Sequence, residues 1–217
     1  MRNTVFLLLG MLLLITSSAV QAEESTVPEF KYKALWSGMS SSPTGRFAGI
    51  GKELKDMGVE VTRVSNAVVL TEELLKDYDF LVFACRQEIL SLGEQDLIVR
   101  YVQKGGSLLA VCGLTGGHPE VINPVVNNFG IMVTRTRTGS TKMTYFAHPA
   151  TTNRRPIESC LLTDSLLMTV SNGAEIIGGR DFAGAPASME CYLGLGGKTA
   201  CGRVIVTSDD GFWQTYG

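Results

Sequence analysis

The sequence contains few of the residues on which metal sites, phosphate-binding loops and nucleic-acid interfaces depend. Its 217 residues include two histidines, His118 and His148, and no Cys/His cluster has the spacing of a zinc site. Two glycine–lysine stretches, 45–52 and 196–199, depart from the spacing of a Walker loop. The net charge of −2 provides no positive field to attract nucleic acid. We therefore expect no metal, no cofactor and no nucleic-acid partner.

Long apolar runs are missing after the first residues, so the chain has no later segment that could span a membrane. At the start, Arg2 precedes an apolar run at residues 5–15, and small side chains at Val20 and Ala22 are typical of a signal-peptidase site. The run is shorter than the roughly 20 residues that a bilayer requires. We therefore predict a cleavable signal peptide at residues 1–22, rather than an anchor helix, and export to the periplasm or the exterior.

The remainder predicts one domain. Residues 23–29 are polar and form a linker, and residues 30–217 form a single α/β domain of sufficient length for a sizeable core. The sequence stops at Gly217, where a closing helix is expected to begin, which is typical of a truncated or unusually abrupt C-terminus.

Strand and helix patterns alternate over residues 31–130. We predict strands at 31–37, 59–64, 79–85 and 107–112, and helices at 47–57, 71–77, 91–104 and 119–129. The clearest local signal is a capping box formed by Ser91 and Glu94. After Gly130 the pattern changes to short strands, at 131–138, 142–147, 175–178, 188–193 and 203–207. This order indicates a doubly wound α/β fold with a mostly parallel sheet and an antiparallel C-terminal extension.

The order of these elements also resembles a known family. The stretches LTEELLKDYDFLVFAC and LGEQDLIVRYVQKGGSLLAVCG, followed by AHPATTNRRPIES and GKTACGRVIVTSDDGF, resemble the ThuA-like branch of the class I glutamine amidotransferase-like superfamily. The resemblance implies a flavodoxin-like sheet. The superfamily includes enzymes with a Cys nucleophile, a distant His and an acid, and also domains without them, so it implies a fold more firmly than a function.

Ligands of open parallel sheets bind at the carboxyl ends of the strands. The loops that follow the predicted strands contain polar residues and a glycine, and these are our candidate ligand-binding residues: Ser40, Ser41, Arg86, Gln87, Gly113, Asp209 and Asp210. A polar small molecule or a glycan would match such a lining. Asp209 and Asp210 alone provide too few oxygen ligands for a dedicated cation site.

Cys112 is the candidate nucleophile, because it ends a buried strand and is followed by Gly113. His118 and His148 are the two candidate bases. Ala110 occupies the position where the amidotransferase pattern has glycine, and the loop at 113–118 is longer than a sharp strand-to-helix turn. We therefore prefer the interpretation that Cys112 is a buried or disulfide-bonded strand residue.

An exported chain with five cysteines is expected to form disulfides and to leave one cysteine over. Cys85 and Cys112 end strands that we expect to be neighbours, so we predict a bond between them. Cys191 and Cys201 flank a glycine-rich turn and form the second predicted pair, with Cys160 remaining in a loop.

Three functions are compatible with these observations. The one we prefer is a non-catalytic exported domain that binds a polar small molecule, a glycan or a protein partner. The alternatives are a Cys112-dependent hydrolase or amidotransferase-like enzyme, and an accessory of polysaccharide metabolism that uses Asp209 and Asp210.

Overall fold

The computed structural model of the chain describes most of the predicted domain. The described residues are 31–38, 48–113, 117–137, 141–148, 159–162, 165–179, 187–193 and 199–208. The predicted signal peptide and linker lie outside them, as do Ser40, Ser41, Asp209 and Asp210. Within the described residues, no helix has both the length and the apolar character needed to cross a bilayer.

Seven of the described strands form a central sheet in the order β2-β1-β3-β4-β12-β11-β9. The first five in this order run parallel, β11 pairs antiparallel with β12, and β9 pairs antiparallel with β11. Their bounds are β1 Tyr32–Gly38, β2 Val59–Val64, β3 Phe80–Ala84, β4 Ser107–Val111, β9 Glu175–Ile176, β11 Ala187–Leu193 and β12 Thr199–Thr207. The sheet confirms the predicted doubly wound, mostly parallel α/β fold and its antiparallel extension.

The helices begin and end at the local signals in the sequence. The capping box is present at α4, because Glu94 N–H donates to Ser91 Oγ and the Glu94 side chain accepts from Ser91 N–H. The turn after α2 ends at Gly58, whose φ of +78° is a left-handed conformation that favours glycine. The helical bounds are α2 Ala48–Asp56, α3 Glu72–Leu75, α4 Leu92–Gln103 and α5 Pro119–Val126, with a 3₁₀ turn η1 at Asn127–Phe129.

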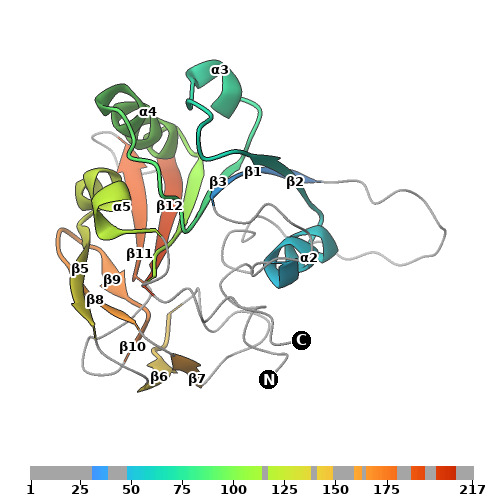
Figure 1. Cartoon of the computed structure of the whole chain (residues 1–217). Helices are drawn as coiled ribbons and strands as arrows, with labels where there is room; N and C mark the ends of the chain where they lie inside the picture. Colours follow the sequence, from blue (N-terminus) through green and yellow to red (C-terminus); the bar gives the residue numbers. More distant parts are fainter. Residues whose placement is uncertain are drawn as a thin grey trace.

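Both faces of the sheet are covered (Figure 1). On one face, side chains of α3, α4 and α5 pack on alternate residues of the strands, including Leu35, Phe83 and Ala110. On the other face, α2 and a small sheet that includes residues 141–145 cover the intervening residues, including Trp36 and Val82. Burial on both sides explains why β3 and β4 have continuous apolar sequences.

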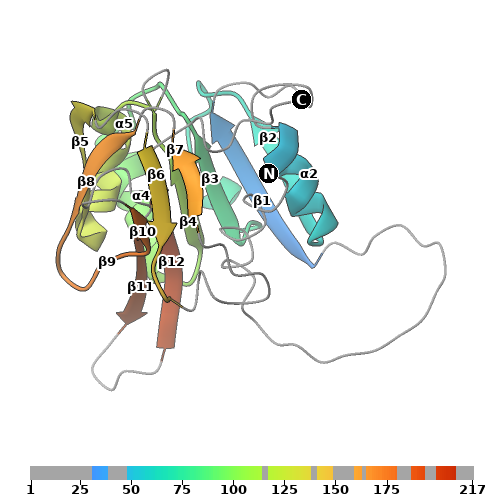
Figure 2. The same ribbon diagram turned by 90° about the horizontal axis from the view of Figure 1, so that it is seen from below.

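The remaining described strands form two smaller sheets (Figure 2). β5 Ile131–Arg137 pairs antiparallel with β8 Leu166–Val170, and β6 Thr141–Tyr145 pairs with both β7 Ser159–Leu162 and β10 Gly178–Gly179. No strand was predicted at β7 or β8, and the strand predicted at 175–178 is divided between β9 and β10. Cys160, which we expected in a loop, has its backbone in β7.

Candidate functional site at the carboxyl edge of the sheet

The carboxyl ends of four strands are aligned. Gly38 of β1 is in register with Ala84 of β3, which in turn pairs with Val111 of β4, and Val111 pairs with Thr207 of β12. The ladder continues one residue further, because Cys112 N–H donates to the Thr207 carbonyl at 2.9 Å. The loops that follow these strands therefore start at a common edge, as the fold predicts for a ligand site.

Arg86 is the most unusual side chain at this edge, because it is cationic and only 2 % exposed. Its Nη1–H donates to the hydroxyl of Ser37, and its guanidinium carbon lies 5.7 Å from the centre of the Phe83 ring. Its Nε, which is also buried, has no hydrogen-bond acceptor. A buried donor without an acceptor costs about 1–3 kcal/mol, and more when the group is charged.

The charge of Arg86 is only partly compensated. Burial lowers the pKa of the Arg86 guanidinium, and the negative charges of Glu94 and Glu88 act in the opposite direction. An arginine side chain nevertheless stays protonated in a protein. Among the described residues, no carboxylate lies within ion-pair distance of it. The site therefore contains a buried positive charge that the described residues do not neutralise directly.

Glu94 acts on Arg86 through its charge while its own oxygens bond elsewhere. Its Oε1 accepts from Leu70 N–H at 3.0 Å, and its Oε2 accepts from the N–H and the hydroxyl of Ser91 at 2.9 and 2.8 Å. Burial alone would raise the pKa of Glu94, but these hydrogen bonds and the charge of Arg86 lower it overall. Glu94 thus links the loop before α3 to the start of α4 through these hydrogen bonds.

Ser208 is a second buried polar group without a partner. Its side chain is fully buried, and its Oγ has no hydrogen-bond partner. It follows Val206 by two residues, as Ser37 follows Leu35, and both aliphatic side chains pack on the face that α4 covers. Alternation along β1 directs the Ser37 hydroxyl to the same face as the Phe83 ring. Ser208 directly follows β12 and, unlike Cys85, has no left-handed backbone, so we infer the same direction for its hydroxyl.

Arg86 was a predicted site residue, whereas Ser37 and Ser208, which lie where two of the predicted loops begin, were not among the predicted ligand-binding residues. The available signal was a serine two positions after an inward-facing aliphatic residue near a strand end. Of the other selected residues, Gln87 is exposed and Gly113 is buried. Ser40, Ser41, Asp209 and Asp210 lie outside the described residues.

Cys85 and Cys112 end adjacent strands, as predicted, but their side chains lie on opposite faces of the sheet. Cys112 packs in the cluster beneath α4 and α5, whereas Cys85 packs in the cluster on the α2 side. The reason is a left-handed backbone at Cys85, where φ is +52°, which reverses the alternation. The structure accordingly contains two buried thiols where we predicted a Cys85–Cys112 disulfide. The side chains of Cys191 and Cys201 lie outside the description.

The candidate nucleophile and the two candidate bases have different surroundings in the structure. Cys112 is fully buried in an apolar cluster, whereas His118 is exposed at the residue before α5. His148 Nε2 lies 3.5 Å from Glu175 Oε2, on β9. β12 and β11 separate β9 from β4, which places β9 about 14 Å from β4 at roughly 4.8 Å per strand.

The backbone at Gly117 packs against the carboxyl ends of β3 and β4. Its φ is +69°, and a Cβ at this position would lie 2.8 Å from both the Cys85 Cα and the Val111 carbonyl oxygen. The same Cβ would lie 3.3 Å from the Cys112 Cα. The backbone before α5 is thus packed directly on the strand ends, which helps to bury Cys112.

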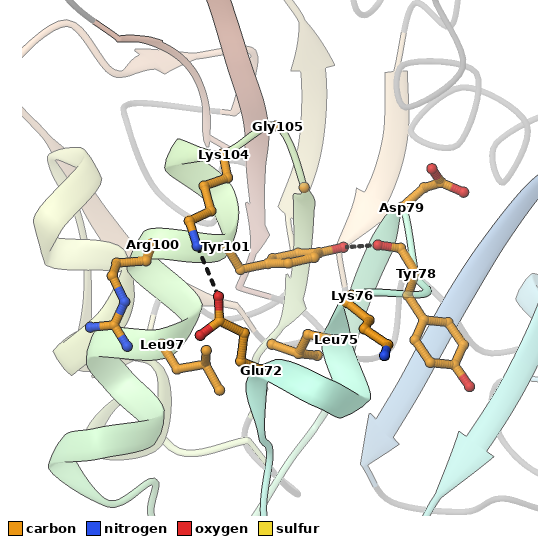
Figure 3. Close-up of a pocket in the computed structure, with 11 residues that line it drawn as sticks. Glu72, Leu75, Lys76, Tyr78, Asp79, Leu97, Arg100, Tyr101, Lys104 and Gly105 are labelled. Carbon is orange, nitrogen blue, oxygen red and sulfur yellow. Dashed lines mark hydrogen bonds and ion pairs between the residues drawn. The ribbon is translucent and has the colours of Figure 1, made fainter.

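A separate cavity of about 520 Å³ lies between α3 and α4, at the opposite edge of the sheet (Figure 3). The groups along its wall bond to one another. Lys104 Nζ lies 2.9 Å from Glu72 Oε1, and the Tyr101 hydroxyl donates to the Tyr78 carbonyl at 2.9 Å. The hydrogen bond and charge of Lys104 lower the pKa of Glu72. Among the described residues, no buried polar atom of this wall lacks a partner.

No family model matches this sequence, and no curated protein sequence is significantly similar to it. Solved structures are similar in fold at low sequence identity. The N-terminal domain of mmIFT52 matches with a TM-score of 0.62 and 14 % identity, over 84 % of this chain and 88 % of that chain. A ThuA-like protein from Bacteroides uniformis matches with a TM-score of 0.53 and 13 % identity, over 88 % and 86 %.

A glutamine amidotransferase from Thermotoga maritima also matches, with a TM-score of 0.50 and 10 % identity, over 81 % of this chain and 74 % of that chain. At these identities the likeness concerns the fold alone. The sequence resemblance to this group is confirmed at that level. The chain therefore has the α/β fold that ThuA-like proteins share with glutamine amidotransferases.

Proposed function

We propose that this protein is an exported binding protein whose domain holds a polar ligand at the carboxyl edge of the central sheet, without cysteine–histidine catalysis. The observation that carries the proposal is the buried guanidinium of Arg86, whose Nε has no acceptor. Native proteins satisfy the great majority of their buried polar groups, so such an exception calls for a functional explanation.

A second orphan group supports the same edge. Ser208 Oγ is buried without a partner and lies on the same face of the sheet as Ser37, which accepts a hydrogen bond from Arg86. A ligand with oxygen acceptors would satisfy Arg86 Nε, and the Ser208 hydroxyl could either donate to it or accept from it. The absence of catalysis is inferred from the burial of Cys112 and from the distance between β4 and the strand that holds Glu175 beside His148.

A ligand screen tests the binding site. Residues 23–217 would be screened by thermal shift against neutral sugars, amino acids, carboxylates and phosphates, in the wild type and in Ser208→Ala. We expect at least one compound to raise the midpoint of the wild type and to lose most of that effect in Ser208→Ala. Lys104→Gln is the matched control, because Lys104 lines the cavity at the opposite edge.

A compound whose effect is lost in Lys104→Gln and kept in Ser208→Ala would move the site to the cavity between α3 and α4. A screen with no stabilising compound would contradict the proposal.

Export rests on the sequence and needs its own test. Expression of the full chain in a bacterium with a general secretory pathway should give a periplasmic product whose mass begins at Glu23. Ala22→Tyr removes the small residue that signal peptidase requires, and it should leave the precursor uncleaved. A wild-type product that remains in the cytoplasm with residues 1–22 attached would contradict export.

A further inference from the structure

We infer that the ligand of this edge carries a carboxylate group, which pairs side-on with the Nε and Nη2 donors of Arg86. The inference rests on the proposed binding function and specifies its ligand class. It is drawn from the hydrogen bonds that Arg86 makes, from the charges around it and from the shape of the donor edge that it leaves open.

Arg86 has more hydrogen-bond donors than the described residues satisfy. A guanidinium has five N–H groups in a fixed plane. Among the described residues, the Ser37 hydroxyl is the one acceptor for this side chain, and it bonds to Nη1. Phe83 covers one side of the guanidinium. The buried Nε of Arg86 has no acceptor. In a guanidinium the Nε–H bond runs parallel to one N–H bond of Nη2, and together the two match the oxygens of a carboxylate.

The charge balance also calls for an anion. Arg86 is the one buried cationic side chain among the described residues. Glu94 is buried nearby, but both of its oxygens bond to Leu70 and Ser91, so it offers Arg86 no direct pair. Glu88 is exposed and acts through its charge alone. An anion bound to Arg86 would provide the direct partner that a buried charge requires.

The amount of charge favours a carboxylate over a phosphate. Arg86 and the ionised Glu94 carry opposite charges, so any bound anion adds net negative charge to the site. A carboxylate adds one negative charge, whereas a phosphate group carries about −1.5 to −2 at neutral pH and would bury more negative charge beside Glu94. The Ser208 hydroxyl, which lacks a partner, is available as a further donor on the same face of the sheet.

The test observes the Arg86 Nε–H signal directly, by proton–nitrogen NMR of ¹⁵N-labelled residues 23–217. The probes are acetate and benzoate, with acetamide and benzamide as neutral analogues and inorganic phosphate as a second anion, all at constant ionic strength. We expect the two carboxylates to move the signal saturably and the amides to leave it in place. Arg86→Lys assigns the signal and should weaken benzoate binding by about tenfold or more, because it keeps the charge and loses the fork.

Arg100→Gln is the control, since Arg100 lines the cavity at the other edge, and it should leave benzoate binding unchanged. The inference is overturned if neither carboxylate moves the signal, or if phosphate binds as tightly as benzoate. It is also overturned if Asp209→Asn or Asp210→Asn shifts the signal without any probe, in the direction opposite to benzoate, because the chain would then supply its own carboxylate.

The two proposals can fail separately. Neutral sugars could stabilise the wild type, lose this effect in Ser208→Ala and leave the Arg86 Nε–H signal in place. That result would support the binding site and contradict a carboxylate as its ligand. If no compound of any class acts through Ser208 or Arg86, both fall.

Discussion

Arg86 donates a hydrogen bond to the hydroxyl of Ser37, a residue 49 positions earlier in the chain, at the end of the neighbouring strand. The bond joins the loop after β3 to β1, and both groups are buried. It fixes the guanidinium in one orientation and thereby determines which of its donors remain open at the edge of the sheet. The two serines of this edge should accordingly respond in different ways to the same substitution.

Ser37→Ala removes the acceptor of a buried charged donor. We expect it to lower the free energy of unfolding by about 1.5–3 kcal/mol, the usual value for a hydrogen bond to a charged group. Ser208→Ala removes a buried hydroxyl that has no partner, so it should leave stability unchanged or raise it slightly. Urea unfolding of the two variants measures this difference, and equal losses would contradict the assigned bonding.

Glu94→Gln should lower stability in a pH-dependent manner. The folded-state pKa of Glu94 lies below its ordinary value, so its carboxylate stabilises the fold above the unfolded pKa of about 4.3. This contribution is lost as the pH falls through the folded-state pKa. We expect a deficit of about 1–2 kcal/mol at pH 7, typical of a lost cap, that shrinks below about pH 4.

Glu73→Gln is the control for that experiment, because Glu73 pairs with Lys76 on the exposed surface of α3 and should change stability by less than about 0.5 kcal/mol. A deficit of Glu94→Gln that is the same from pH 3 to pH 7 would show that the charge of Glu94 does not contribute.

Gly117→Ala should be much more destabilising than Gly173→Ala. Both glycines have a positive φ, +69° and +85°, which costs an alanine about 1–2 kcal/mol. A Cβ at Gly173 meets nothing within 4 Å, whereas at Gly117 it would lie 2.8 Å from backbone atoms of Cys85 and Val111. Overpacking of this kind adds about 1–3 kcal/mol. Thermal unfolding that gave equal losses would mean that the segment before α5 moves away at little cost.

Cys85 and Cys112 should resist labelling by a maleimide in the folded protein, because they are 1 % and 0 % exposed. Both should react fully in denaturant without a reducing agent, since the structure holds them as thiols. Peptide mass mapping reads both results. A peptide linked through Cys85 and Cys112 would contradict the left-handed backbone at Cys85, and rapid labelling of Cys112 in the folded protein would revive a nucleophilic role.

The elements up to residue 130 could be predicted because their signals are local. The Ser91–Glu94 box and the glycine at position 58 mark the helix ends whatever surrounds them. β7 and β8 could not be predicted in this way. β8 pairs with β5, which lies some 30 residues earlier, so its strand conformation depends on a tertiary partner rather than on its own sequence pattern.

The position of the site at the edge of the sheet could be predicted from the sequence, but most of the side chains that form it could not. The carboxyl edge follows from the order of parallel strands, and Arg86 is visible as a polar residue directly after a buried strand. The contribution of Ser208 depends on the burial of its hydroxyl without a partner, which the sequence does not indicate. The reversed side chain of Cys85 depends on a single backbone angle, and a cysteine gives no signal for a positive φ.

The position of β12 bears on how the chain is made. β4 borders β3 on one side, and its other side is filled by a strand that ends at Thr207, 96 residues after its partner Val111. During synthesis, β4 therefore presents an open row of hydrogen-bonding groups until almost the whole described chain has left the ribosome. Such an edge recruits other chains, and contacts this distant form slowly. A nascent chain of this topology benefits from being kept unfolded until translation ends.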